Sequence, residues 1–350
     1  MLRTAIAAAL ALGAAAPAWA GDEKAATLTI GDQAPAIDIA HWLKGAKVDE
    51  FETGKIYVLE FWATWCGPCK VSIPHLTELQ EHYLDYDVTI IGLSNEDLQT
   101  VVGFLSKADK QEMLWNEKMH YTVATDPDKS VYGAYMTASG QGGIPTAFII
   151  GKDQRIEWIG NPISPKGEID RAIEAVSTDS WDRDLYRKIV ALREQAREAQ
   201  MKDEHEVALG LFDELIALDP HSGVRYTHDK FKLLLTVLDR PGEAYLIGRD
   251  VIQANWDDSG FLNGIAWFVV DSKAVKTRDL EFAMKAAKRA NTLTDQKDPA
   301  ILDTVARVYF EMGDLEKAIV CQRQAVKCAA DTPYAEDIAK TLKQYEAQEK

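Results

Sequence analysis

The sequence predicts an α/β domain followed by an all-α domain made of helical repeats. Across residues 31–177, apolar runs of strand length alternate with stretches of helical periodicity, which is typical of a sheet with parallel strands at its centre. From residue 182 this strand pattern is lost, and Ala, Leu, Glu, Lys and Arg dominate the composition. We therefore predict two domains, at residues 21–178 and 182–350.

The first domain is expected to contain at least four strands and three helices. The strands are predicted at residues 56–61, 88–94, 146–150 and 156–159, and the helices at 69–83, 97–107 and 168–176. Pro74 falls inside the first helix, where it removes one backbone hydrogen bond and favours a kink. We expect Ser94 or Asn95 to cap the second helix, with Glu96 and Asp97 in its first turn.

The first twenty residues have the composition of a cleavable secretory signal peptide. Arg3 is their only charged residue, an Ala- and Leu-rich core follows, and Ala18-Trp19-Ala20 provides small residues for cleavage. The apolar core is short and weak for a membrane anchor, since a span needs about 20 strongly apolar residues. We therefore expect an exported, periplasmic protein that begins near Gly21 and is not stably inserted in the membrane.

The chain without this segment is strongly acidic. Removing Arg3 from the 39 basic side chains leaves 38 against 55 acidic ones, a formal charge of −17. Such a surface repels nucleic acid and anionic lipid, so neither is expected as a partner. The seven histidines show no metal-ligand spacing such as HExxH, and phosphate-binding and dinucleotide-binding glycine loops are absent from the sequence. We therefore predict no metal and no cofactor.

The motif Trp65-Cys66-Gly67-Pro68-Cys69 lies between a predicted strand and a predicted helix. Two cysteines three positions apart at such a turn can form one disulfide, and the helix N-terminus stabilises a thiolate. This arrangement suits thiol–disulfide exchange. In an oxidising compartment the same pair could instead be an inert structural bridge.

Residues 58–70 resemble the active-site segment of thioredoxins, and residues 31–177 resemble the exported TlpA/ResA-like thioredoxins. The resemblance rests on the CxxC motif, on Pro74, on the opening segment at residues 31–35, and on Gly143-Ile144-Pro145-Thr146. It implies a thioredoxin fold, with a central mixed sheet flanked by helices, and a thiol–disulfide oxidoreductase that acts on protein disulfides. Thioredoxin, which has the same Gly-Pro between its cysteines, is strongly reducing, at about −270 mV, which favours a reductase.

The resemblance also implies roles for individual residues. Cys66 is expected to be the attacking thiolate, and Cys69 the resolving thiol that releases the reduced substrate. Gly67 and Pro68 keep the turn between them compact. Glu60 stands where thioredoxins have a buried Asp, and there it would accept the proton of Cys69. The alternation of residues around Glu60 leaves open that it is an exposed strand residue.

Ile144-Pro145 matches the thioredoxin proline, whose peptide bond is cis and which lies against the CxxC motif. The backbone of Ile144 would then pair with an incoming substrate peptide. Only about 5% of X-Pro bonds are cis, so this expectation depends on the family alone. Trp62 and Trp65 are expected at the wall and rim of the substrate groove, with Trp65 as the better candidate for contact.

The second domain shows a repeat close to the tetratricopeptide period of about 34 residues. Ala208, Ala244, Ala283 and Ala318 are spaced by 36, 39 and 35 residues. Small residues at these positions let the two helices of a hairpin approach closely, while aromatic residues fill the gap to the next hairpin. A generic helical bundle is the alternative interpretation.

Two further cysteines, Cys321 and Cys328, lie seven residues apart on one predicted helix. Seven residues span roughly 10 Å along a helix axis, which is too far for a disulfide unless the helix ends early. We expect them to be buried small residues of the last repeat.

The sequence leaves two classes of function open. In the first, the chain is a protein-disulfide reductase whose repeats hold a partner, and the resemblance implies a membrane electron donor of the DsbD or CcdA type. In the second, the chain is a binding adaptor whose repeats recruit a partner and whose first domain is structural. Retention of Cys66, Cys69, Glu60 and Pro145 favours the first, because a scaffold does not require the thiol pair.

Overall fold

The structure, a computed structural model, describes residues 26–163, 167–219, 223–330 and 332–348. The predicted signal peptide at residues 1–20 lies outside these ranges. The chain divides into two compact units, Met1–Asp184 and Leu185–Lys350. Within the described ranges, no helix is both long enough and apolar enough to cross a membrane.

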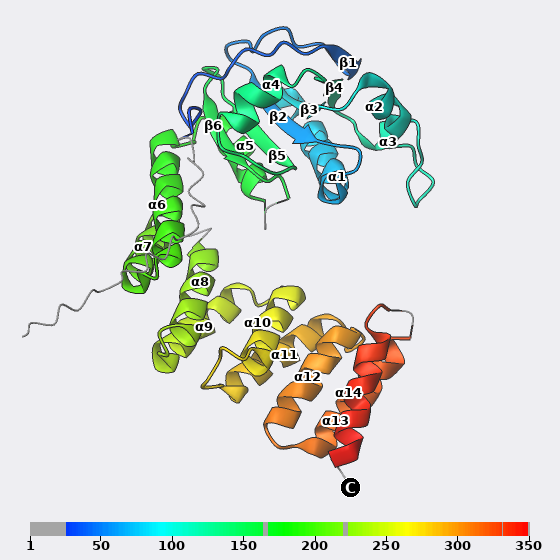
Figure 1. The fold of residues 1–350 in the computed structure, drawn as a ribbon, viewed down its shortest axis with the longest axis vertical. Coiled ribbons are helices and arrows are strands. Elements are labelled where there is room, and N and C mark those ends of the chain that lie inside the picture. Colours follow the sequence, from blue (N-terminus) through cyan, green and yellow to red (C-terminus); the bar gives the residue numbers. More distant parts are fainter. Residues whose placement is uncertain (1–25, 164–166, 220–222, 331, 349–350) are drawn as a thin grey trace, which may run out of the picture. The chain divides into compact units, whose positions relative to one another are not determined.

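A six-stranded mixed sheet forms the centre of the first unit (Figure 1). The strands lie in the order β1-β4-β3-β2-β5-β6; β2, β3 and β4 are parallel, and the other pairings are antiparallel. Their bounds are β1 (His41–Lys44), β2 (Ile56–Trp62), β3 (Val88–Ser94), β4 (Thr122–Thr125), β5 (Thr146–Ile150) and β6 (Ile156–Gly160). The four predicted strands are confirmed. The sequence reasoning missed β1 and β4, which have only four residues each, too few to show a period.

Helices pack around this sheet and confirm the predicted thioredoxin-like α/β architecture (Figure 1). They are α1 (Gly67–His82), the short turn η1 (Leu84–Tyr86), α2 (Leu98–Leu105), α3 (Trp115–Lys118), α4 (Ser130–Tyr132), η2 (Gly133–Thr137) and α5 (Glu168–Ser177). All seven residues of β2 are buried, because β2 has strands on both sides and is covered on both faces. The end of this central strand therefore holds the following turn in a fixed position.

The predicted cap of α2 is wrong. Asp97 is the N-cap residue, and its carboxylate accepts hydrogen bonds from the amide and the hydroxyl of Thr100, at 3.0 and 2.6 Å. Ser94 is instead the last residue of β3, and Asn95 precedes the cap by two positions. Asp97 fits this position because its side chain can reach the third amide of the helix, as an N-cap requires. The helix predicted at 97–107 is also shorter in the structure, where α2 covers Leu98–Leu105.

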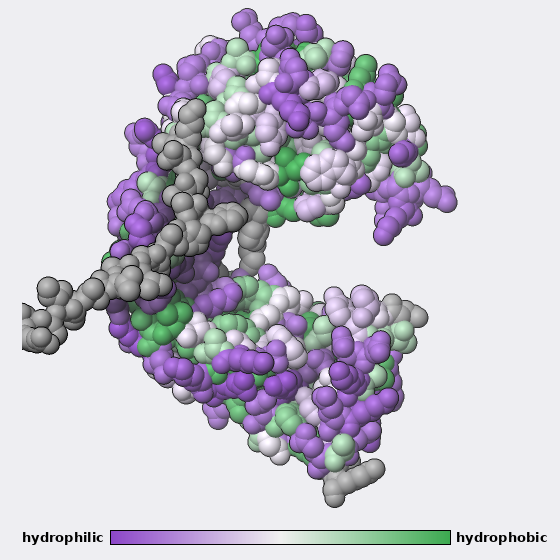
Figure 2. All heavy atoms as spheres, viewed as in Figure 1, coloured by the Kyte–Doolittle hydropathy of each residue, from purple (hydrophilic) through white to green (hydrophobic). Residues whose placement is uncertain are grey.

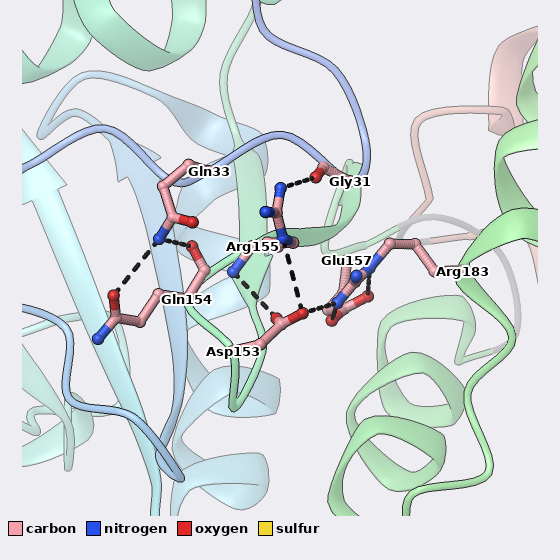
Figure 3. A network of polar contacts seen from close by, with 7 residues as sticks. All are labelled: Gly31, Gln33, Asp153, Gln154, Arg155, Glu157 and Arg183. Carbon is pink, nitrogen blue, oxygen red and sulfur yellow. Dashed lines mark hydrogen bonds and ion pairs between the residues drawn. The ribbon is translucent and has the colours of Figure 1, made fainter.

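A polar network attaches the opening segment of the first unit to the β5–β6 hairpin (Figure 3). Arg155 donates to the carbonyl of Gly31 at 2.8 Å, and Gln33 donates to the carbonyl of Gln154 at 3.0 Å. Glu157, a buried carboxylate of β6, is bound by the guanidinium of Arg183, which also contacts Asp153 at 2.7 Å. These contacts satisfy a buried charge and hold residues 31–33 against the sheet.

The second unit is helical throughout its described residues, as predicted. Its elements are α6 (Arg183–Met201, which begins before the division of the units), α7 (His205–Leu218), α8 (Gly223–Thr236), α9 (Pro241–Ala254), α10 (Ser259–Asp271), α11 (Leu280–Leu293), α12 (Pro299–Glu311), α13 (Leu315–Cys328) and α14 (Ala335–Gln348). Neighbouring helices pack as pairs, most extensively α8 with α9, α10 with α11 and α12 with α13.

The four alanines that define the predicted repeat occupy equivalent places. Each is the fourth residue of its helix, in α7, α9, α11 and α13, and each is fully buried. Phe231 of α8 lies 6.3 Å from the ring of Phe268 in α10 and 5.8 Å from that of Phe282 in α11, so aromatic residues do connect one helix pair to the next. These placements support a helical repeat, and its assignment to the tetratricopeptide class stays a prediction.

Cys321 and Cys328 both lie in α13, and neither forms a disulfide. Both are half-buried, which is less than the full burial we expected. Because α13 continues to Cys328, the two sulfur atoms stay about two turns apart.

Candidate active site

The two cysteines of the CxxC motif form a disulfide at the N-terminus of α1. Their Cα atoms are 5.3 Å apart, and the sulfur–sulfur distance is 2.01 Å. Cys66 is the N-cap residue of the helix, and its sulfur accepts a hydrogen bond from the amide of Cys69 at 3.1 Å. When the disulfide is reduced, the same amide and the helix dipole would stabilise a thiolate on Cys66.

The disulfide itself is buried, whereas the residues beside it in the motif are exposed. Trp65 is 72% exposed, and Gly67 and Pro68 are also exposed, whereas Cys66 and Cys69 retain only 3% and 0% of their surface. Substrate can therefore reach the pair only at the Cys66 edge, beside Trp65. On the face seen in Figure 2, hydrophobic residues interrupt the hydrophilic surface of the first unit near α1. Val71 on α1 is itself 67% exposed.

Trp62 does not form a groove wall as expected. Its side chain is buried, and its ring packs against Phe104 of α2 with 5.4 Å between the centroids. The reason is its position in β2, where every residue lies inside the unit. Of the two tryptophans, only Trp65 is available for contact.

The Ile144–Pro145 peptide bond is cis, as the family resemblance led us to expect. The carbonyl oxygen of Ile144 lies 3.8 Å from the sulfur of Cys66. Pro145 is buried immediately before β5, which pairs antiparallel with β2, so the two strands bring this loop beside the CxxC turn. Ile144 and Cys66 are 78 positions apart in sequence and adjacent in the site.

Glu60 is a buried carboxyl group without a hydrogen-bond partner. It is 1% exposed, and neither carboxylate oxygen has a partner. Burial raises the pKa of Glu60 to about 8, and the nearby Ser72 hydroxyl opposes this shift in part. Ser72 itself donates to the carbonyl of Cys69 at 2.8 Å, so its hydroxyl connects the surroundings of Glu60 with the second cysteine. The alternative of an exposed strand residue is thereby excluded.

Two other buried polar atoms lie on the same side of the sheet as Glu60. Gly92 pairs with Glu60 in the parallel register of β2 and β3, and a side chain at Gly92 would collide with the rings of Tyr121 and Trp62. The Tyr121 hydroxyl and the Trp62 indole N–H have no partner either. Burial, and then the charge of Glu60, raise the pKa of Tyr121 well above its usual range. Glu60 is therefore buried in the core, beside polar groups that form no hydrogen bond to it.

Burial of Glu60 predicts a pH-dependent stability. In the unfolded chain this carboxyl group titrates near its ordinary pKa of about 4.3, and in the folded protein near 8. Between these values the folded state retains the proton that the unfolded state loses. The free energy of unfolding should therefore fall by about 1.4 kcal/mol for each pH unit from pH 5 to 8 because of this group.

In Glu60→Gln, this component of the pH dependence should disappear, and the variant should be more stable than the wild type at pH 8. The measurement is urea unfolding of the oxidised protein at pH 5 and pH 8, monitored by near-ultraviolet circular dichroism. Glu78→Gln, which changes an exposed carboxylate on α1, is the matched control and should follow the wild type. If the free energy of unfolding changed equally between pH 5 and pH 8 in the wild type and in Glu60→Gln, Glu60 would not have a raised pKa in the folded protein.

Glu96 is a site residue that the sequence reasoning did not identify. Its carboxylate accepts hydrogen bonds from the amide and hydroxyl of Thr64, at 2.6 and 2.8 Å, and from the hydroxyl of Ser94 at 3.1 Å. It therefore joins the end of β3 to the residue two positions before Cys66. The contact links residues 32 positions apart, and no pattern in a single sequence could have indicated it.

Among the described residues, no group of three or more His, Cys, Asp or Glu side chains is arranged to hold a metal ion. The groups that the structure brings together at this site are the thiol pair, the buried carboxyl group of Glu60 and the backbone of Ile144.

Comparison with known proteins places similarity in the first unit. Residues 30–159 match the AhpC/TSA family. The thiol-disulfide oxidoreductase ResA of Bacillus cereus is 30% identical over 131 residues, which cover 37% of this chain and 68% of ResA. Protein FixW of Rhizobium leguminosarum is 26% identical over 151 residues, 43% of this chain and 68% of FixW.

Among solved structures, a thioredoxin-family thiol:disulfide interchange protein of Chlorobium tepidum is 24% identical. The match covers 42% of this chain and 99% of that one, with a TM-score of 0.30.

Proposed function

We propose that this chain, which belongs to the ResA-like thiol-disulfide oxidoreductases of the AhpC/TSA family, is an exported reductase of protein disulfides that uses Cys66 and Cys69. The observation that carries the proposal is the position of the pair. Cys66 caps α1, accepts a hydrogen bond from Cys69 and lies beside the exposed Trp65. An inert bridge would need neither the thiolate-stabilising helix end nor a buried carboxyl group behind it.

The reaction proceeds in two exchanges. The Cys66 thiolate attacks one sulfur of a substrate disulfide; a bond forms between Cys66 and that sulfur, and the other substrate sulfur leaves as a thiolate. Cys69 then loses its proton, which Glu60 accepts when it is in its ionised form, and attacks the sulfur of Cys66. The bond between Cys66 and the substrate breaks, and the second substrate thiolate leaves. Two electrons pass from the thiol pair to the substrate, and the Cys66–Cys69 disulfide seen in the structure is the product state.

Substrate is held at the edge of the site by backbone and apolar contacts. The Ile144 backbone lies at the sulfur of Cys66, where an extended substrate peptide can pair with it. Trp65, next to Cys66 in sequence, and Val71 of α1 provide exposed apolar surface. Main-chain pairing supplies affinity with little dependence on sequence, which suits an enzyme that acts on protein disulfides.

Each cycle leaves the pair oxidised, so a reductant must restore it. By family analogy we propose a membrane electron donor of the DsbD or CcdA type. The signal-peptide pattern of residues 1–20 supports export, to the periplasm, and the helical unit is proposed to hold a protein partner.

The test is dithiothreitol-driven reduction of insulin by the chain from residue 21 to 350. The reductase proposal expects insulin to precipitate faster than with dithiothreitol alone. The adaptor alternative, in which the first unit is only structural, expects no acceleration. A rate equal to that of dithiothreitol alone would therefore reject the proposed reductase.

A further inference from the structure

The helical unit contains a pocket that the redox chemistry does not use. It has a volume of about 240 Å³ and lies where side chains of α10, α12 and α14 meet. The residues that matter to its chemistry are Trp267 from α10, Asp303, Arg307 and Phe310 from α12, and Gln344 and Tyr345 from α14. Three of these six are aromatic, and two are charged.

The aromatic residues form a wall. The rings of Phe310 and Tyr345 stack with 4.6 Å between centroids and an angle of 12° between planes. Trp267, which is half-buried, adds a third ring from a different helix. Aromatic faces carry negative charge density, so a wall of this kind attracts a cation that has lost part of its water.

The carboxylate in the pocket lacks a basic partner. Asp303 accepts a hydrogen bond from Gln322 at 2.5 Å, and in the part of the chain that the structure describes no basic side chain forms an ion pair with it. Burial, followed by the charges of Asp271 and Asp337, raises the pKa of Asp303, while Gln322 and Arg307 oppose this shift. A bound cation would offset the cost of holding this carboxylate away from water.

Arg307 does not make the pocket a site for anions. Its guanidinium is bound by Glu311 at 2.9 Å and by Asp271 at 3.4 Å. Glu311 also pairs with Arg278 at 2.9 Å, so the basic side chains here are already matched by carboxylates. Asp303 is then the carboxylate of the pocket that no basic side chain among the described residues pairs with, so the pocket has a surplus negative charge.

Tyr345 provides a second, independent observation. The residue is 4% exposed, and its hydroxyl is buried without a hydrogen-bond partner. Burial raises the pKa of Tyr345 to about 12, and the charges of Arg307, Asp303 and Glu311 act on the same hydroxyl. This hydroxyl can both donate and accept a hydrogen bond, and an ammonium or guanidinium group could supply the donor for its oxygen.

We propose that this pocket binds the cationic side chain of a lysine or arginine from a partner protein, with Asp303 opposite the charge and the three aromatic rings around its alkyl stem. The inference deepens the proposal that the helical unit holds a protein partner, and it rests on that proposal. It names the chemistry of one anchor of that partner.

The test uses the chain from residue 21 to 350, labelled with ¹⁵N, and two short capped peptides that differ at one position. One peptide, acetyl-Gly-Ser-Lys-Ser-Gly-amide, carries lysine, and the other carries norleucine, which has the apolar stem without the charge. The indole N–H resonance of Trp267 reports binding, and the spectrum of Trp267→Phe assigns it. We expect the lysine peptide to shift this resonance saturably and the norleucine peptide to leave it unchanged.

Two substitutions test separately what the charge of Asp303 and the hydroxyl of Tyr345 contribute to binding. Asp303→Asn keeps the shape and the Gln322 contact, and should weaken lysine-peptide binding at least about 10-fold, as loss of a partly buried ion pair does. Tyr345→Phe keeps the stacked ring and should weaken binding less. Asp250→Asn, an exposed change on α9, is the matched control and should bind like the wild type. Thermal unfolding of each variant shows whether the helical unit is intact.

Three results would overturn the proposal: equal shifts with both peptides, unchanged affinity in a folded Asp303→Asn, or tighter binding of free spermidine than of the lysine peptide. The last would make the pocket a site for small polyamines. Insulin reduction by the unaltered chain tests the reductase separately. Failure of peptide binding with active insulin reduction rejects only this inference, and the reverse outcome rejects only the reductase.

Discussion

Replacing Cys66 by serine is expected to lower the rate of insulin reduction to the background of dithiothreitol alone. Serine retains the shape of the N-cap and can still accept the hydrogen bond from Cys69, so α1 should begin at the same place. A hydroxyl cannot attack a substrate sulfur to form a disulfide, and Cys69 is fully buried and cannot replace Cys66. The measurement is insulin turbidity with the chain from residue 21 to 350.

The matched control is Cys321→Ser, which removes a thiol from the helical unit and leaves the site unchanged. It should keep the full rate. If Cys66→Ser turned over insulin as fast as the wild type, the exchange chemistry would not belong to this pair.

Replacing Cys69 by serine should stop the reaction after the first exchange, so that the mixed disulfide with the substrate remains in cells. The Cys66 thiolate can still attack a substrate, but the thiol that resolves the mixed disulfide is missing. Covalent complexes should therefore accumulate in the exported fraction and should separate when dithiothreitol is added. Non-reducing electrophoresis followed by mass spectrometry detects them, and the trapped proteins are the substrates.

The control for trapping is the double variant Cys66→Ser/Cys69→Ser, which should form no complexes. Complexes that form equally in the double variant would come from Cys321 or Cys328, the remaining thiols of the chain. Absence of any complex with Cys69→Ser alone would favour the adaptor alternative, in which the helical unit acts without the thiols.

Sequence patterns predicted the long elements of this protein and failed at the short ones. The apolar run of β2 and the helical stretch of α1 are long enough to show their periods, whereas β1 and β4 have four residues each. The cap of α2 failed for a different reason. Four consecutive residues, Ser94 to Asp97, can all cap or begin a helix, and the choice among them depends on where β3 ends. That end is set by pairing with β2 and β4, which is tertiary information.

The candidate site was predictable where a local motif defines it. The strand-to-helix turn placed Cys66 and Cys69, and the family resemblance alone gave the cis bond before Pro145. Burial of Glu60 was implied by the family resemblance but not by the residue pattern, because every residue of β2 is buried and alternation along such a strand carries no information about faces. The same complete burial explains why Trp62, expected at the substrate groove, lies in the core.

The helical unit shows a similar division between pattern and packing. The alanine spacing predicted the repeat register, since all four alanines occupy the same turn of alternate helices. The pocket at Asp303 was not predictable, because its residues come from α10, α12 and α14 and meet only when the helix pairs stack.

We propose that Cys66 and Cys69 drive reduction, and their redox potential distinguishes a reductase from an oxidant. The chain from residue 21 to 350 is equilibrated with defined ratios of reduced and oxidised dithiothreitol or glutathione, and the fraction of disulfide is measured by thiol alkylation and mass spectrometry. We predict a potential near that of thioredoxin, about −270 mV, so that the reduced pair gives its electrons to substrate disulfides. A potential near that of the oxidant DsbA, about −120 mV, would instead make this pair an oxidant, because such a pair accepts electrons from its substrates.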